Sequence, residues 1–79
     1  MKVLVTGGAG YIGSVLTRNL LRSGHEVTVL DALLFGGDSV RELHGNSRYT
    51  LVEGDIRDDG LVGRLAREKD AVVHLAAIV

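Results

Sequence analysis

Four glycines stand within seven residues near the start of the chain, in the stretch VTGGAGYIG (residues 5–13). Glycine costs roughly 0.5–1 kcal/mol relative to alanine inside regular structure, so such a cluster indicates a special demand on the backbone. A chain that turns tightly into a helix while an anion approaches its N–H groups has no room for Cβ atoms. We therefore predict that Gly7 and Gly10 form a turn open to a pyrophosphate, and that Gly13 lets the helix pack closely on a sheet.

A carboxylate is predicted on the other side of the same site. The stretch GAGYIG (residues 8–13) satisfies G-x-G-x-x-G, and Asp31 follows it at the end of a second apolar run. In this position the Asp31 carboxylate can accept hydrogen bonds from both hydroxyls of an adenosine ribose, and its charge repels a 2′-phosphate. A charge pair at ~4 Å is worth about 1 kcal/mol in water and ~4 kcal/mol at an effective dielectric of 20. Because residues 32–40 contain no Arg or Lys, the sequence favours NAD over NADP.

Short apolar runs alternate with helical patterns along the whole chain. This alternation is typical of an α/β fold, in which parallel strands are joined by right-handed crossovers. We predict the N-terminal part of a Rossmann-like doubly wound parallel sheet, with strand order 3-2-1-4 and flanking helices, over residues 1–79. The predicted strands are 2–6, 26–30, 49–53 and 71–75, and the predicted helices are 10–23, 39–45 and 58–69.

Two helices have a predicted buried face, read from a period of 3.6 residues. The first helix is expected to stop at Gly24, and Asn19 is a polar residue within its apolar stripe. The stripe of the first helix consists of Ile12, Val15, Leu16 and Leu20, and that of the last helix of Leu61, Val62, Leu65 and Ala66.

Composition excludes several classes of function. Nine basic and ten acidic residues leave a net charge of −1, so nothing indicates a nucleic-acid partner. There is no cysteine and the three histidines are scattered, so neither a disulfide nor a metal site is expected. No secretory signal and no apolar run near ~20 residues is present, which favours a cytoplasmic protein without a membrane span.

The last nine residues, AVVHLAAIV, are apolar at eight positions. An apolar strand at an open sheet edge is unusual, so we expect these 79 residues to be an N-terminal piece of a longer protein with a fifth strand. Within this run, His74 is expected to be a packed, hydrogen-bonded core histidine rather than a catalytic one.

Four stretches together resemble one family. TGGAGYIG (residues 6–13) is similar to the T-G-x-x-G-x-x-G loop of the extended short-chain dehydrogenase/reductase family. VTVLD (27–31), EGDIRD (53–58) and VVHLAA (72–77) are similar to three later elements of that family, in the same order and spacing. The resemblance is closest to NAD-dependent nucleotide-sugar epimerases and dehydratases.

The resemblance implies a role for each part of the predicted site. It implies that the cofactor is held through the amides of Tyr11 and Ile12 at the pyrophosphate, Asp31 at the ribose, Asp55 and Ile56 at the adenine, and Leu75, Ala76 and Ala77 after the fourth strand. In this reading the Asp55 carboxylate accepts from the adenine amino group.

The resemblance also implies an activity that these residues alone do not complete. The family acts on nucleotide sugars by hydride transfer through a keto sugar, often as a homodimer, with a Tyr-x-x-x-Lys pair as the catalytic group. Tyr11 and Tyr49 are followed four residues later by Val15 and Glu53, so no such pair is present. No catalytic residue is therefore assigned, and the 79 residues alone are expected to be inactive. The alternatives are a non-catalytic NAD(P)-binding regulatory relative and an isolated half-Rossmann binding module.

Overall fold

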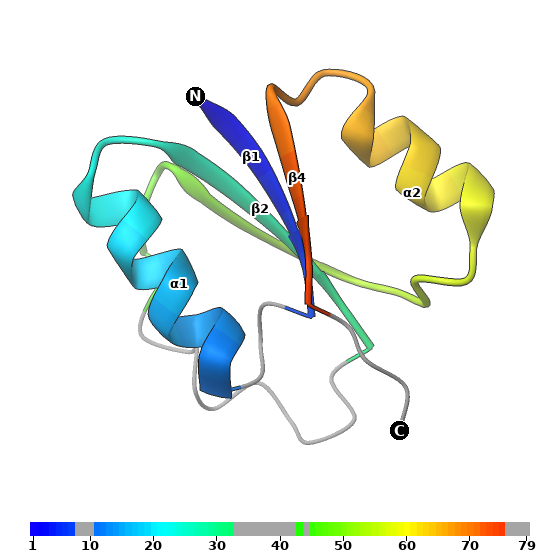
Figure 1. Cartoon of the computed structure of the whole chain (residues 1–79), viewed down its shortest axis with the longest axis horizontal. Coiled ribbons are helices and arrows are strands. Elements are labelled where there is room, and N and C mark those ends of the chain that lie inside the picture. The colour runs from blue at the N-terminus through cyan, green and yellow to red at the C-terminus, as the bar shows by residue number, and fades with distance from the viewer. Residues whose placement is uncertain (8–10, 33–42, 44, 76–79) are drawn as a thin grey trace.

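The computed structural model describes residues 1–7, 11–32, 43 and 45–75, which form one parallel sheet with a helix on each side (Figure 1). The strand order is β3-β2-β1-β4, which confirms the predicted α/β class and the order 3-2-1-4. Of the helix predicted at 39–45, only residues 43 and 45 are among those described. The elements are β1 (Lys2–Thr6), α1 (Tyr11–Arg22), β2 (Glu26–Asp31), β3 (Tyr49–Glu53), α2 (Asp59–Ala66) and β4 (Ala71–His74).

The two central strands, β1 and β2, carry the core on both of their faces. Leu4 and Leu30 are fully buried on one face. The other face contributes alternate residues to a cluster with Leu21 of α1 and the ring of Tyr49. This burial on two sides explains why both strands appear in the sequence as nearly continuous apolar runs. The buried β1 and β2 members of that cluster are Val3, Val5, Val27 and Val29.

The buried face of α1 differs from the predicted one. Ile12 is 71% exposed and Val15 is 44% exposed, whereas Leu16 and Leu20 pack partly against the core as predicted. The fully buried residues of the helix are Gly13, Ser14, Thr17 and Leu21.

Small side chains explain the rotation of this face. The absence of a side chain at Gly13 and the short ones at Ser14 and Thr17 permit a close approach of helix and sheet that larger residues would prevent. The Ser14 hydroxyl donates to the Tyr11 carbonyl oxygen at 2.9 Å, so its burial leaves this group bonded. The same rotation places Asn19 on the exposed side. Asn19, a polar residue within the predicted apolar stripe, is therefore not part of the face that α1 buries.

The end of α1 is confirmed at Gly24, which has a φ of 92°. The N–H of Gly24 donates to the Leu21 carbonyl at 3.0 Å and the N–H of His25 to the Leu20 carbonyl at 3.1 Å. These two bonds form a Schellman motif, which requires a left-handed residue that glycine adopts without steric cost. Arg48, just before β3, also donates from Nη2 to the Leu21 carbonyl at 2.9 Å.

Helix α2 is shorter than predicted and begins directly after Asp58, which caps its amino end. The Asp58 carboxylate accepts from the Leu61 N–H at 3.0 Å, which satisfies one of the free amides of the first turn. A Cβ on Gly54 would lie 2.6 Å from Leu61 Cδ2 and 3.2 Å from Leu30 Cδ1. Gly54 therefore permits the contact between α2 and the sheet. The four predicted face residues of α2 are all partly buried, and none is fully buried.

The expectation of a core position for His74 is wrong. His74 ends β4, which forms one edge of the described sheet, and its side chain is exposed, like Val72 two residues earlier. The expected hydrogen bond is present, because His74 Nδ1 lies 2.7 Å from Thr6 Oγ1 on the neighbouring strand. Within the described ranges, no helix is long and apolar enough to cross a bilayer.

Candidate dinucleotide-binding site

The carboxyl ends of the four strands meet at one edge of the sheet. Each residue that follows β1, β3 and β4 donates its N–H to an adjacent strand: Gly7 to the Leu30 carbonyl at 2.8 Å, Gly54 to Asp31 at 3.0 Å, and Leu75 to Thr6 at 2.9 Å. Since neighbouring strands lie about 4.8 Å apart, these bonds bring Gly7, Asp31, Gly54 and Leu75 to a common edge. This is the edge at which open α/β sheets bind ligands.

The first part of the predicted pyrophosphate site is a glycine turn facing a helix start. Gly7 has a φ of 80°, a left-handed conformation that explains the need for glycine at this position. The first turn of α1 lies beside the carboxyl ends of the strands (Figure 1), and its Tyr11 and Ile12 are exposed. Their amides are among those that a helix leaves without an intrahelical acceptor, which suits an anion. Gly13 is buried as predicted, and Gly10 lies outside the described residues.

Asp31 ends β2 in a partly buried position beside Glu53 of β3. Its charge acts on Tyr49, whose pKa is raised by burial and, to a smaller degree, by the negative charge of Asp31. Tyr49 belongs to the core cluster on the α1 side of the sheet. The alternation of side chains along β2 places Asp31 on the same side as Val27 and Val29 of that cluster. A ribose next to Gly7 and the start of α1 would therefore be within reach of this carboxylate.

Asp55 is exposed and is held by a residue that the sequence analysis did not identify. Arg57 Nη2 donates to Asp55 Oδ2 at 2.8 Å, and Arg57 Nε lies 3.1 Å from each carboxylate oxygen. The Arg57 backbone N–H donates to Oδ1 at 2.8 Å. Together these bonds lower the pKa of Asp55 to about 2. The Asp-x-Arg spacing in EGDIRD was the available signal, because a carboxylate commonly accepts from the N–H two residues on.

Ile56, predicted to lie beside the adenine, offers a complementary group. Within the described part of the chain, the Ile56 amide donates to no other backbone carbonyl. Asp55 therefore presents an acceptor and Ile56 a donor on consecutive residues. The adenine edge carries the matching pair, an amino donor at position 6 and an acceptor at N1.

We expect Arg57→Met to raise the pKa of Asp55 from about 2 toward its ordinary value of 3.8. The lowered pKa means that the pair stabilises the folded state above pH ~4, and that this contribution is lost as the pH falls toward 2. The carboxyl ¹³C shift of Asp55, followed by NMR from pH 6 to 2, measures this change. Arg64→Met, on the exposed side of α2, is the control and should leave the titration unchanged. An Asp55 titration identical in the Arg57 variant and the original chain would contradict the role of the guanidinium.

The last predicted segment is described only in part. Leu75 is partly buried, and its N–H is bonded to the end of β1. Ala76 and Ala77 lie outside the described residues. The lining role of these three residues therefore stays a prediction.

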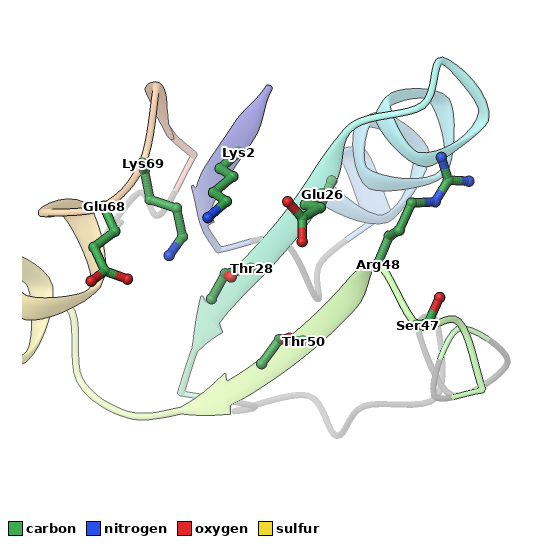
Figure 2. Close-up of a pocket in the computed structure, with 9 residues that line it drawn as sticks. Lys2, Glu26, Thr28, Ser47, Arg48, Thr50, Glu68 and Lys69 are labelled. Atoms are coloured by element: carbon green, nitrogen blue, oxygen red, sulfur yellow. The ribbon is translucent and has the colours of Figure 1, made fainter.

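A hollow of about 150 Å³ lies at the opposite end of the sheet, near the amino ends of β1, β2 and β3 (Figure 2). Thr28 and Thr50 lie on neighbouring strands in its floor, and none of the predicted cofactor residues lines it. Cations and carboxylates are mixed around it, so it has no single-sign charge to attract a phosphate. No group of three metal-ligating side chains occurs among the described residues. The charged residues of the hollow are Lys2, Glu26, Arg48, Glu68 and Lys69.

The comparison with known families is consistent with this geometry. Residues 3–79 match the model of the NAD dependent epimerase/dehydratase family. A dTDP-glucose 4,6-dehydratase from Mycolicibacterium smegmatis is 48% identical over 79 residues, and a UDP-glucose 4-epimerase from Lactobacillus helveticus is 46% identical over 79 residues. Each alignment covers 98% of this chain but only 24% and 23% of the relative. The chain thus spans about a quarter of the length of these curated relatives.

Solved structures show the same arrangement. A dTDP-glucose 4,6-dehydratase from Bacillus anthracis, solved in complex with NAD, superposes with a TM-score of 0.87 and 33% identity over 99% of this chain and 27% of its own. A UDP-glucose 4-epimerase from Stenotrophomonas maltophila, with bound NAD and formylated UDP-arabinopyranose, superposes with a TM-score of 0.86 and 43% identity. This match covers 100% of this chain and 25% of the epimerase chain. These neighbours confirm the Rossmann-like fold.

Proposed function

The chain belongs to the NAD dependent epimerase/dehydratase family, and we propose that it is the NAD-binding portion of an enzyme that acts on a nucleotide sugar. The observation that carries this proposal is the common edge formed by the ends of β1, β2 and β3. There a left-handed Gly7 follows β1, the partly buried Asp31 ends β2, and the exposed Asp55 lies two residues after β3. A glycine turn, a helix start and two carboxylates match the pyrophosphate, ribose and adenine of one dinucleotide.

Each described residue has a separate task in this proposal. Gly7 and the amides of Tyr11 and Ile12 bind the pyrophosphate, since they combine backbone access with the positive end of α1. Asp31 accepts the ribose hydroxyls and repels a 2′-phosphate, which favours NAD over NADP. Gly10, Ala76 and Ala77 complete the same proposal from the sequence.

The substrate class follows from the family and from named relatives. The Stenotrophomonas epimerase binds a UDP sugar, and a Bordetella bronchiseptica enzyme of the same fold was solved with NAD and UDP. NAD, when bound, supplies a hydride acceptor for a sugar carbon, so that a keto sugar can be epimerised, dehydrated or reduced. The described residues hold the cofactor in place and contribute no Tyr-x-x-x-Lys pair to that chemistry. Cytoplasmic location and a homodimer of the complete enzyme remain expectations.

The proposal is tested by titrating NAD, ADP-ribose and nicotinamide mononucleotide into ¹⁵N-labelled protein. We expect NAD and ADP-ribose to shift the amide resonances of Gly7, Tyr11, Ile12 and Ile56. Nicotinamide mononucleotide lacks the adenosine half, so it should leave the Ile56 resonance and those next to Asp31 in place. The amides of Thr28 and Thr50 in the opposite hollow serve as internal controls. Shifts confined to these two threonines, or absent with ADP-ribose, would contradict the proposed site.

A further inference from the structure

The last residue of β1, Thr6, carries a buried hydroxyl that packing alone does not require. Thr6 is 1% exposed, and its register partners on the neighbouring strands are Leu30 and His74. Leu4, two residues earlier on the same face of the sheet, is fully buried. Valine has the shape of threonine without the hydroxyl, and a hydroxyl among apolar neighbours destabilises a fold unless it is bonded. The bond of 2.7 Å between Thr6 Oγ1 and His74 Nδ1 therefore points to a role for this hydroxyl.

The burial of Thr6 decides the direction of this hydrogen bond. A neutral imidazole has one donor nitrogen and one acceptor nitrogen. Among the described residues, His74 is the only hydrogen-bond partner of Thr6 Oγ1. If His74 Nδ1 carried the proton, the hydroxyl hydrogen of Thr6 would be buried without an acceptor, which is unfavourable. The Thr6 hydroxyl therefore donates to Nδ1, and the imidazole proton lies on Nε2, where the exposed side of His74 meets water.

Two hydrogen bonds join Thr6 to successive residues at the end of β4. The Thr6 hydroxyl donates to His74 Nδ1, and the Thr6 carbonyl oxygen accepts from the Leu75 N–H at 2.9 Å. The next residue along the chain is Gly7, which has a φ of 80° and donates its N–H to the Leu30 carbonyl. The glycine turn of the predicted pyrophosphate site thus leaves β1 from a residue that is held by its side chain as well as by its backbone.

We propose that His74 is a positioning residue for the pyrophosphate site: its Nδ1 accepts from the Thr6 hydroxyl and so fixes the direction in which the chain enters the turn at Gly7. This inference rests on the proposed NAD function and adds to it a side chain that itself touches no ligand. The bond is additional to the backbone pairing of β1 and β4, so its removal leaves the sheet in place. A turn that is free to shift binds a ligand more weakly, because binding must then order it.

The first test is calorimetric titration of NAD into variants of the two bonded residues. Thr6→Val should weaken NAD binding by about 3- to 10-fold, the effect of one hydrogen bond, while urea unfolding shows that the fold is retained. His74→Gln should weaken it equally, because glutamine has no acceptor at the position of Nδ1. His74→Asn should keep the affinity within about 2-fold of the original, because asparagine Oδ1 takes that position.

Thr28→Val is the matched control for Thr6→Val. Thr28 is the register partner of Leu4 and lies on the same face at the other end of the sheet. It is partly buried, and its hydroxyl makes no hydrogen bond with a described residue. Its replacement should leave NAD binding unchanged.

Two further measurements distinguish positioning from a general structural role. Adenosine lacks the pyrophosphate, so its affinity, followed by NMR, should be the same in Thr6→Val, His74→Gln and the original protein. A long-range ¹H–¹⁵N spectrum at about pH 8.5, where a histidine is normally neutral, should show His74 as the Nε2–H tautomer. Thr6→Val should abolish the preference for this tautomer, since Nδ1 then has no donor to accept from.

The outcomes separate this inference from the function on which it rests. An Nδ1–H tautomer in the original protein, or an NAD affinity that Thr6→Val leaves unchanged, would overturn the role of His74 while NAD binding stands. Equal losses of NAD and adenosine affinity, or a loss in His74→Asn as large as in His74→Gln, would overturn it as well. If neither NAD nor ADP-ribose binds the folded original protein, the proposed function itself fails, and the tautomer then reports only on the bond between Thr6 and His74.

Discussion

Replacing Asp31 with alanine is expected to weaken NAD binding by about 10- to 100-fold, because a charged acceptor of two ribose hydroxyls is lost. The same replacement should strengthen NADP binding by about 10-fold or more, since a 2′-phosphate no longer faces a carboxylate. The variant would thereby lose the preference for NAD. Calorimetric titration of both dinucleotides into the original and the variant protein measures the two changes.

Glu53→Ala is the matched control for this prediction. Glu53 is the register partner of Asp31 on β3 and ends its strand at the same edge, but its side chain is exposed. Its removal changes the net charge by the same amount and should alter the affinity for either dinucleotide by less than about 3-fold, because exposed charges are screened. If the original protein binds NADP as tightly as NAD, the assignment of Asp31 to the ribose is wrong.

Tyr49 provides an internal check on the Asp31 variant. The negative charge of Asp31 is the smaller of the two causes that raise the pKa of Tyr49. In Asp31→Ala the pKa of Tyr49 should therefore fall, yet stay above its ordinary value because burial persists. Absorbance titration of the phenolate reports this shift and shows that the core cluster around Tyr49 is intact.

Gly54→Ala is expected to destabilise the fold by about 1–3 kcal/mol, the usual cost of forcing a methyl group into a packed contact. The added Cβ would lie 2.6 Å from Leu61 Cδ2 and 3.2 Å from Leu30 Cδ1. Leu61 can move by shifting α2, but Leu30 is fully buried and has no space to move into. For a chain of this size such a loss is a large part of the total stability. Urea unfolding followed by circular dichroism measures it.

Gly63→Ala tests the same substitution where the structure leaves room. Gly63 lies within α2, is exposed, and a Cβ there would meet nothing within 4 Å. Alanine should stabilise the helix by roughly 0.5–1 kcal/mol relative to glycine, so the two variants should change stability in opposite directions. Changes of the same sign would show that the contact at Gly54 does not limit the packing of α2. The Gly54 N–H donates to the Asp31 carbonyl, so a displacement of residue 54 would also displace Asp31. Gly54→Ala should therefore weaken NAD binding as well.

Much of the fold was predictable because its signals are local. The runs KVLVT and YTLVE became strands with the predicted bounds, and Gly24 ended α1, since a two-sided sheet and a left-handed cap each demand a particular residue type. The strand order followed from the alternation of elements and the handedness of their crossovers. The family, too, was evident from four short stretches in order, and the family comparison confirmed it.

Other features depended on contacts between distant residues. The period of apolar residues in the sequence located α1 but predicted a buried face that includes Ile12 and Val15. The helix instead packs on the sheet through Gly13, Ser14 and Thr17. Hydropathy undervalues such small residues, because their benefit comes from the close approach they allow.

His74 and Asp55 illustrate the same limit. An apolar strand predicted a buried His74, but exposure depends on which neighbours cover the edge of the sheet. The sequence determined by itself that a glycine turn and carboxylates would follow parallel strands. Only the tertiary structure decided that the Arg57 guanidinium would bind both carboxylate oxygens of Asp55. The direction of each side chain within a turn depends on the backbone conformation that the packed fold imposes there.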